Sequence, residues 1–124
     1  MKNIFTYGSI VLLLFLSSFT SVDEVVSAIK NGSASQLSKF FDNAIEITLT
    51  DKSSTYSKSQ AELVLKDFFE NNVVKGFEVL HKGDNAAAQF IIGTLYTKMG
   101  EYKTTIYIKQ KGDKQLLQEL RFEK

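Results

Sequence analysis

The sequence contains no cysteine and no proline, and it has a single histidine among its 124 residues. The absence of cysteine excludes disulfides, thiolate metal sites, a cysteine nucleophile and a lipid anchor on an N-terminal cysteine. Carboxylates are then almost the only available metal ligands, and no acid-rich loop has the spacing of a calcium site. The glycines are isolated, so no phosphate-cradling loop is present. The sequence therefore predicts neither a metal ion nor a cofactor.

The first twenty residues have the layout of a secretory signal peptide. Lys2 supplies a positive charge, Ile10–Leu16 is an unbroken apolar run, and Ser18 and Thr20 fit the −3 and −1 positions of a cleavage site. The alternative is an uncleaved membrane anchor, but a spanning helix needs about 20 apolar residues and this run is shorter. We therefore predict a signal peptide over residues 1–20, a single mature domain over residues 21–124, and export to the periplasm or the extracellular space, with no membrane attachment after cleavage.

Neither sign of charge is in excess in the predicted mature chain. Lys2 is the only charged residue of the first twenty, so the remainder holds 14 basic and 14 acidic side chains. A nucleic-acid-binding protein usually carries a basic face that releases counterions from phosphate. The balanced charge therefore argues against nucleic acid, and also against electrostatic capture by anionic lipid.

Helix patterns come first in the mature chain. Ser21 with Glu24 fits a capping box that opens a helix ending at Asn31-Gly32. Ser33 with Gln36 opens a short second helix, whose apolar face consists of Leu37, Phe40 and Phe41. A short strand hairpin follows from the alternation over residues 45–49 and a return over residues 55–57.

The clearest helix begins after this hairpin, with a capping box of Ser59 and Glu62, and ends at Asn71-Asn72. It carries enough apolar surface on one side to cover a sheet. The residues of this apolar side are Ala61, Val64, Leu65, Phe68 and Phe69.

The remainder reads as strand. Ala86–Gln110 shows the period-2 alternation of two strands joined by a turn that contains Gly100, a residue able to adopt positive φ. Val73–Leu80 and Gln115–Phe122 flank this hairpin, so we predict a four-stranded antiparallel meander. Gly76 and Gly93 lie inside strands, where glycine often marks a bulge or a bend. A sheet curved in this way can enclose a pocket.

The order of two short helices, a short hairpin, a long helix and a four-strand meander resembles the nuclear-transport-factor-2-like superfamily. Segments such as SQAELVLKDFF and the FIIGTLYT–YKTTIYIKQ hairpin resemble a small, uncharacterised group of secreted bacterial domains within it. The resemblance covers about Val22–Glu123. It implies an α+β, cystatin-like cone: a curved, mostly antiparallel sheet wrapped around one long helix, with a cavity at the wide end. It also implies that many relatives pair through the outer sheet face.

Enzymes of this superfamily typically hold a carboxylate inside the cone, often with a histidine, arginine or tyrosine. Here the strand acids fall on the polar phase of their strands (Glu46, Glu78, Glu119 and Glu123). His81 begins a polar turn, which favours a solvated residue over a catalytic one. Arg121 lies between Glu119 and Glu123, which favours a surface charge ladder over an anion clamp. We predict no catalytic residues and favour a non-catalytic domain over an enzyme.

Two functions remain open. The first is the binding of a small apolar or amphipathic ligand in the cone, by side chains that we expect to face the core. Ordinary packing at the rim of the core is the plainer explanation of the tyrosines among them. The predicted pocket consists of Tyr56, Phe68, Phe90, Ile92, Thr94, Tyr96, Tyr102, Thr104, Ile106 and Gln118.

The second is an interaction domain with a self-filled core that binds through the outer sheet face. If Gly93 leaves the alternation unchanged, four large apolar residues cluster on that face, namely Ile91, Leu95, Tyr107 and Leu117. Either the N-terminal elements cover them, or a second copy of the chain pairs there as a homodimer.

Overall fold

The protein is described by a computed structural model over residues 21–124, so the predicted signal peptide lies outside the described residues. Its helices are α2 (Ser21–Lys30), α3 (Ala34–Ser38) and α4 (Lys58–Asn71). Its strands are β1 (Phe41–Leu49), β2 (Lys52–Ser57), β3 (Val74–Asp84), β4 (Ala88–Thr97), β5 (Gly100–Lys111) and β6 (Lys114–Glu123). No helix within residues 21–124 is long and apolar enough to cross a membrane.

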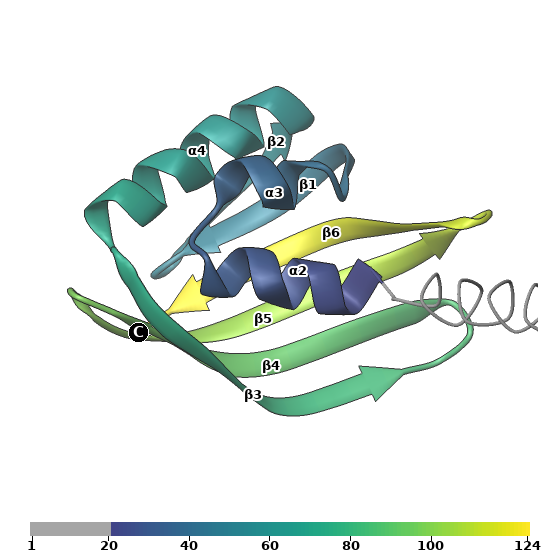
Figure 1. Cartoon of the computed structure of the whole chain (residues 1–124). Coiled ribbons are helices and arrows are strands. Elements are labelled where there is room, and N and C mark those ends of the chain that lie inside the picture. Colours follow the sequence, from purple (N-terminus) through teal and green to yellow (C-terminus); the bar gives the residue numbers. More distant parts are fainter. Residues whose placement is uncertain (1–20) are drawn as a thin grey trace, which may run out of the picture.

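The strands form one six-stranded sheet in the order β2-β1-β6-β5-β4-β3. Every neighbouring pair is antiparallel except β1 and β6, which run parallel. The predicted meander (β3 to β6) and the predicted short hairpin (β1 and β2) are confirmed. The sheet curves beneath α2, α3 and α4, which lie on one side of it, so that none of the described helices covers the other, outer face (Figure 1).

The helix starts follow local capping chemistry. Ser33 has an extended backbone and its hydroxyl accepts the N–H of Gln36 at 3.2 Å, which confirms the predicted start of α3. The capping box of α4 is formed by Ser57 and Gln60, two residues before the predicted pair of Ser59 and Glu62. Ser57 is the last residue of β2, so its extended backbone already has the geometry that an N-cap requires.

The short helix α3 ends at Ser38, earlier than the apolar spacing predicted. Phe41 is therefore the first residue of β1 and not part of a helical face. Its side chain is buried all the same, at 2% exposure. Leu37, Phe40 and Phe41 have helical spacing, but a short apolar run of this kind also fits the start of a buried strand. Spacing alone therefore does not tell where the helix ends and the strand begins.

The prediction that Phe90, Ile92, Thr94 and Tyr96 of β4 face the core is wrong. Ile91 and Leu95 are fully buried, whereas Phe90 is 38% exposed on the outer face. The cause is the β4–β5 hairpin, in which Thr97 pairs with Gly100 across a two-residue loop. Leu95 then pairs with Tyr102, so odd-numbered residues of β4 share the inner face with even-numbered residues of β5.

A bulge changes the alternation of β6. Ile108 pairs with Leu117 and Tyr107 pairs with Glu119, which leaves Gln118 as the extra residue. The bulge brings Leu117 to the inner face together with Leu120 and Phe122, and all three are fully buried. Strict alternation of side chains, without a bulge, predicts Leu117 on the outer face.

The helices cover the inner face with two groups of side chains. At the end of the sheet that holds the β4–β5 turn, α4 contributes Phe68 and Phe69, which pack on Phe122 of β6. The predicted apolar side of α4 is confirmed, since four of its five residues are buried and Val64 packs against them. The remaining inner face is occupied by buried residues of α2 and α3, which are Val22, Val25, Ala28, Ile29, Ala34 and Leu37.

Candidate functional site

The residues of the predicted pocket do not lie together. Phe68, Tyr102, Thr104 and Ile106 face the interior and are at most 7% exposed. Phe90, Ile92, Thr94 and Tyr96 occupy the opposite phase of β4 and lie on the outer face. Tyr56 is half-buried on the edge strand β2, and Gln118 belongs to a separate polar cluster described below.

The interior part of that set forms a packed aromatic cluster. The ring of Phe68 stacks on Phe122 at 4.8 Å between centroids and meets Tyr102 edge-on at 5.2 Å. The hydroxyl of Tyr102 donates to Asn72 Oδ1 at 2.7 Å, and Asn72 is the C-cap of α4. The hydroxyl of this tyrosine, which belongs to the predicted pocket, is thus satisfied by the end of the helix. These rings fill the space between α4 and the sheet.

The outer part of that set, joined by Tyr107, forms an apolar strip across the uncovered side of the sheet. Phe90 pairs with Tyr107 and Ile92 pairs with Thr105, so the strip spans β4 and β5. Tyr96 lies further along β4, where the negative charge of Glu78 raises its pKa, with partial burial and Glu101 contributing in the same direction. We call Phe90, Ile92, Tyr96 and Tyr107 the outer strip.

The predicted dimer face also divides between the two sides. Ile91, Leu95 and Leu117 are buried at 0–1% exposure in the core, so they are not available to a second chain. Tyr107 alone lies on the outer face as predicted, opposite Phe90. The hairpin loop and the bulge at Gln118 account for both errors.

A second feature lies where β1 and β6 separate. Phe41 pairs with Leu117, but the next pair is Glu46 with Glu119. Four residues of β1 therefore face the single residue Gln118, and the parallel ladder is interrupted. Side-chain hydrogen bonds that the Asp42 carboxylate accepts bridge this gap.

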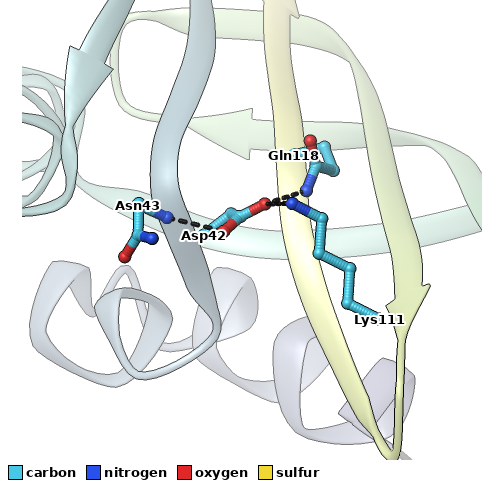
Figure 2. A network of polar contacts seen from close by, with 4 residues as sticks. All are labelled: Asp42, Asn43, Lys111 and Gln118. Carbon is cyan, nitrogen blue, oxygen red and sulfur yellow. Dashed lines mark hydrogen bonds and ion pairs between the residues drawn. The ribbon is translucent and has the colours of Figure 1, made fainter.

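Asp42 accepts three hydrogen bonds there (Figure 2). Lys111 Nζ and Gln118 Nε2 both donate to Asp42 Oδ2 at 2.5 Å, and the Asn43 N–H donates to Asp42 Oδ1 at 2.7 Å. The hydrogen bond from Lys111, followed by those from Asn43 and Gln118, lowers the pKa of Asp42 from 3.8 to about 2. A carboxylate held this far below neutral pH is a poor general base. Asp42 is therefore suited to joining β1 to the β5–β6 hairpin.

The Asp42 cluster forms part of the wall of a groove of about 840 Å³. The groove opens where α2 and α4 begin, where β1 begins and where β5 turns into β6. Its lining is mostly polar and consists of Ser21, Lys39, Phe40, Phe41, Asp42, Asn43, Lys58, Gln110, Asp113, Lys114, Gln115 and Leu116.

The other titratable residues that we considered are not brought together. Arg121 lies 3.7 Å from Glu119 and 3.4 Å from Glu123, which confirms the predicted surface charge ladder. His81 is exposed as predicted, but it lies within β3, where it pairs with Ile92, and not in a turn; its ring is 5.8 Å from that of Phe90. Among residues 21–124, no three histidine, aspartate or glutamate side chains are grouped so that they could hold a metal ion.

Sequence reasoning missed Asp42 and Lys111, and it assigned Gln118 to the predicted pocket instead of to this cluster. The one available signal was the polar pair Asp42-Asn43 between Phe41 and Ile45, at the start of a predicted strand. Its partners Lys111 and Gln118 lie 69 and 76 residues further along the chain. Their approach depends on the parallel pairing of β1 with β6, which no local pattern encodes.

The fold is that of the nuclear-transport-factor-2-like α+β proteins. A putative calcium/calmodulin dependent protein kinase II association domain from Xanthomonas campestris superposes with a TM-score of 0.58 at 13% identity, over 82% of this chain and 81% of that one. The structure described as "Rd1NTF2_04 with long sheet" superposes with a TM-score of 0.66 at 15% identity, over 82% and 94% of the two chains. At these identities the likeness shows the fold alone.

Within this fold class, the chain belongs to the family described as "Domain of unknown function (DUF4783)", whose model matches residues 22–123. A family member from Bacteroides ovatus is 31% identical with a TM-score of 0.79, over 82% of this chain and 92% of that one. A member from Bacteroides uniformis is 27% identical with a TM-score of 0.80, over 82% and 94%. No curated protein matches the chain.

Proposed function

We propose that this domain is an exported, non-catalytic interaction module that pairs with a second copy of itself through the outer strip. The observation that supports this most directly is the outer strip itself, on a sheet face that none of the helices within residues 21–124 covers (Figure 1). Phe90 is 38% exposed there, and Ile92, Tyr96 and Tyr107 are half-buried. Antiparallel sheets with one solvated face usually carry polar residues there. Apolar and aromatic side chains gathered on such a face commonly mark an interaction surface.

Charge complementarity favours a second copy as the occupant. The strip is bordered by acidic residues, Glu78 and Glu101, which lie near Tyr96. It is also bordered by basic residues on the same face, Lys103 opposite Thr94 and Arg121 opposite Thr105. In a two-fold arrangement the same patch meets itself, so a border of both signs can place acids opposite bases.

The alternative function is the binding of a small apolar or amphipathic ligand inside the cone. The rings of Phe68, Tyr102 and Phe122 occupy that space and contact one another. A ligand would have to displace part of this cluster and break the Tyr102–Asn72 hydrogen bond. The pairing function requires no such rearrangement, and we therefore favour it.

Sedimentation velocity of residues 21–124 tests the proposal. We expect the wild type to dimerise as concentration rises into the high micromolar range. Ile92→Lys and Tyr107→Lys should remain monomeric, because each places a charge within the strip. Leu63→Lys is the matched control, since Leu63 is 66% exposed on α4, away from the outer face. A wild type that stays monomeric, or a control variant that loses pairing equally, would overturn the proposal.

A further inference from the structure

The groove beside Asp42 carries an excess of positive charge. Lys39, Lys58 and Lys114 line it, and within residues 21–124 none of the three ammonium groups forms an ion pair. Two carboxylates line it as well, but Asp42 is neutralised by its contact with Lys111. Asp113 is thus the one acidic group of the lining that has no counter-ion, against three unpaired lysines.

Helix α4 adds to this potential. Its first residue, Lys58, lies on the groove, and its first turn contains no acidic residue that would offset the partial positive charge of the helix start. The helix end alone would define no site. Together with the three lysines it adds to the excess of positive over negative charge in the groove lining.

The groove also offers hydrogen-bond donors close to these charges. The side chain of Asn43 points away from Asp42, and its backbone N–H is used by the Asp42 carboxylate (Figure 2). Gln115 lies in the lining near Ser21, whose backbone N–H donates to the side-chain oxygen Oε1 of Gln115 at 3.2 Å. The amide nitrogen of Gln115 remains able to donate to a ligand.

The hydrogen bonds of Asp42 leave the groove with few ligands for a cation. A cation site requires several free carboxylate oxygens, but the Asp42 oxygens already accept bonds from Lys111, Gln118 and Asn43, which leaves Asp113 as the single free carboxylate of the lining. The strand separation that directs Asp42 and Asn43 into this region is of the kind that often lies beside binding sites. The groove volume, about 840 Å³, is within the range of small-molecule sites.

We propose that this groove binds a small soluble molecule that carries several oxyanion groups, either carboxylates or phosphates. Lys58 and Lys114 bind its charged oxygens, and the amides of Asn43 and Gln115 orient it. The Asp42 cluster acts as a positioning element that holds the groove wall in place and does not contact the ligand charge.

Titrations followed by ¹H–¹⁵N NMR, at constant ionic strength, test this with sodium citrate, inorganic phosphate and glycerol as probes. We expect saturable shifts of the amides of Asp42, Asn43 and Gln115 with citrate or phosphate, and none with the neutral glycerol. Saturation by citrate alone would identify carboxylate recognition, and saturation by phosphate alone would identify phosphate recognition. The absence of saturable shifts with both anions would overturn the proposal.

A matched pair of double variants separates this site from general surface charge. Lys58→Ala/Lys114→Ala should bind the anion about tenfold more weakly or worse, because charge-assisted contacts are lost. Lys75→Ala/Lys98→Ala removes the same charge from exposed lysines elsewhere and should bind as the wild type does. Equal losses in the two double variants would show non-specific attraction and refute the site. Tyr107→Lys should bind normally, so that failure of pairing and failure of anion binding are distinguished.

Discussion

The ring of Phe90 lies directly over Gly83, its cross-strand partner on the outer face. A Cβ atom at Gly83 would come within 2.3 Å of Phe90 Cζ, closer than real Cβ contacts allow. Gly83 is therefore required for space and not for an unusual backbone conformation. The position of the aromatic ring at one end of the outer strip depends on this missing side chain.

Gly83→Ala should shift the Phe90 ring with little effect on stability. The ring is the far end of a partly exposed side chain and can rotate away, so we expect a loss below about 1 kcal/mol in the free energy of unfolding. If the outer strip pairs two chains, the same substitution should weaken the dimer. Denaturant unfolding and sedimentation, run on the same sample, measure both effects. Unchanged pairing would remove Phe90 from the contact.

Phe68→Ala should destabilise the domain by about 3–5 kcal/mol, because truncating a buried phenylalanine leaves a cavity. Phe68 is 7% exposed and contacts Phe69, Tyr102 and Phe122. Leu63→Ala, on the exposed side of the same helix, should change stability by less than about 0.5 kcal/mol. Urea unfolding monitored by circular dichroism gives both values. Similar losses for the two variants would contradict the packing of α4.

Gly93→Ala should destabilise the sheet far more than Gly76→Ala. A Cβ at Gly93 would lie 2.4 Å from the backbone oxygen of Glu78, and backbone atoms cannot rotate away. We expect a loss of about 1–3 kcal/mol, as for other overpacked sites. Gly76 has no atom within 4 Å of its Cβ position, so alanine there should lie within about 0.5 kcal/mol of the wild type. Thermal unfolding of both variants checks the difference, and equal stabilities would argue against this close approach.

Asp42→Asn should lower stability near neutral pH by about 1–3 kcal/mol, because the Lys111 contact loses its negative partner. The folded-state pKa of Asp42 is about 2, below the unfolded value near 3.8. Its contribution is therefore fully present above about pH 4 and is lost as the pH falls towards 2. Unfolding curves for the variant and the wild type should converge over that interval.

Asp113→Asn is the control for this pH dependence. Asp113 lies in the exposed β5–β6 turn near the same groove, and its substitution should change stability by less than about 0.5 kcal/mol at any pH. A gap between Asp42→Asn and the wild type that persists at pH 2 would show that the stabilisation does not come from the ionised carboxylate.

Element order was predictable because helices and strands differ in the period of their apolar residues. The face of β4 was not, because Phe90 and Ile92 on one side are as apolar as Ile91 and Leu95 on the other. Burial was decided by the two-residue loop that pairs Leu95 with Tyr102. The alternation of residues therefore predicts that β4 is a strand, but it does not predict which of its two apolar sides is buried.

The Asp42 cluster was beyond sequence reasoning for a different reason. Asp42, Lys111 and Gln118 are ordinary polar residues in three separate segments, with no spacing that indicates a shared site. They meet because β1 runs beside β6 and because Gln118 is an unpaired bulge residue. Both facts are properties of the tertiary structure.

The parallel neighbour of β1, strand β6, is the last of the strands within residues 21–124. Because β6 lies between β1 and β5, it is the strand that joins the β1–β2 hairpin to the meander. A chain lacking β6 would hold a two-stranded and a three-stranded piece with no shared ladder. Closure of the sheet must therefore await β6, and the high sequence separation of its contact with β1 predicts slow folding relative to the local hairpins. A nascent chain that has not yet released β6 cannot complete the sheet.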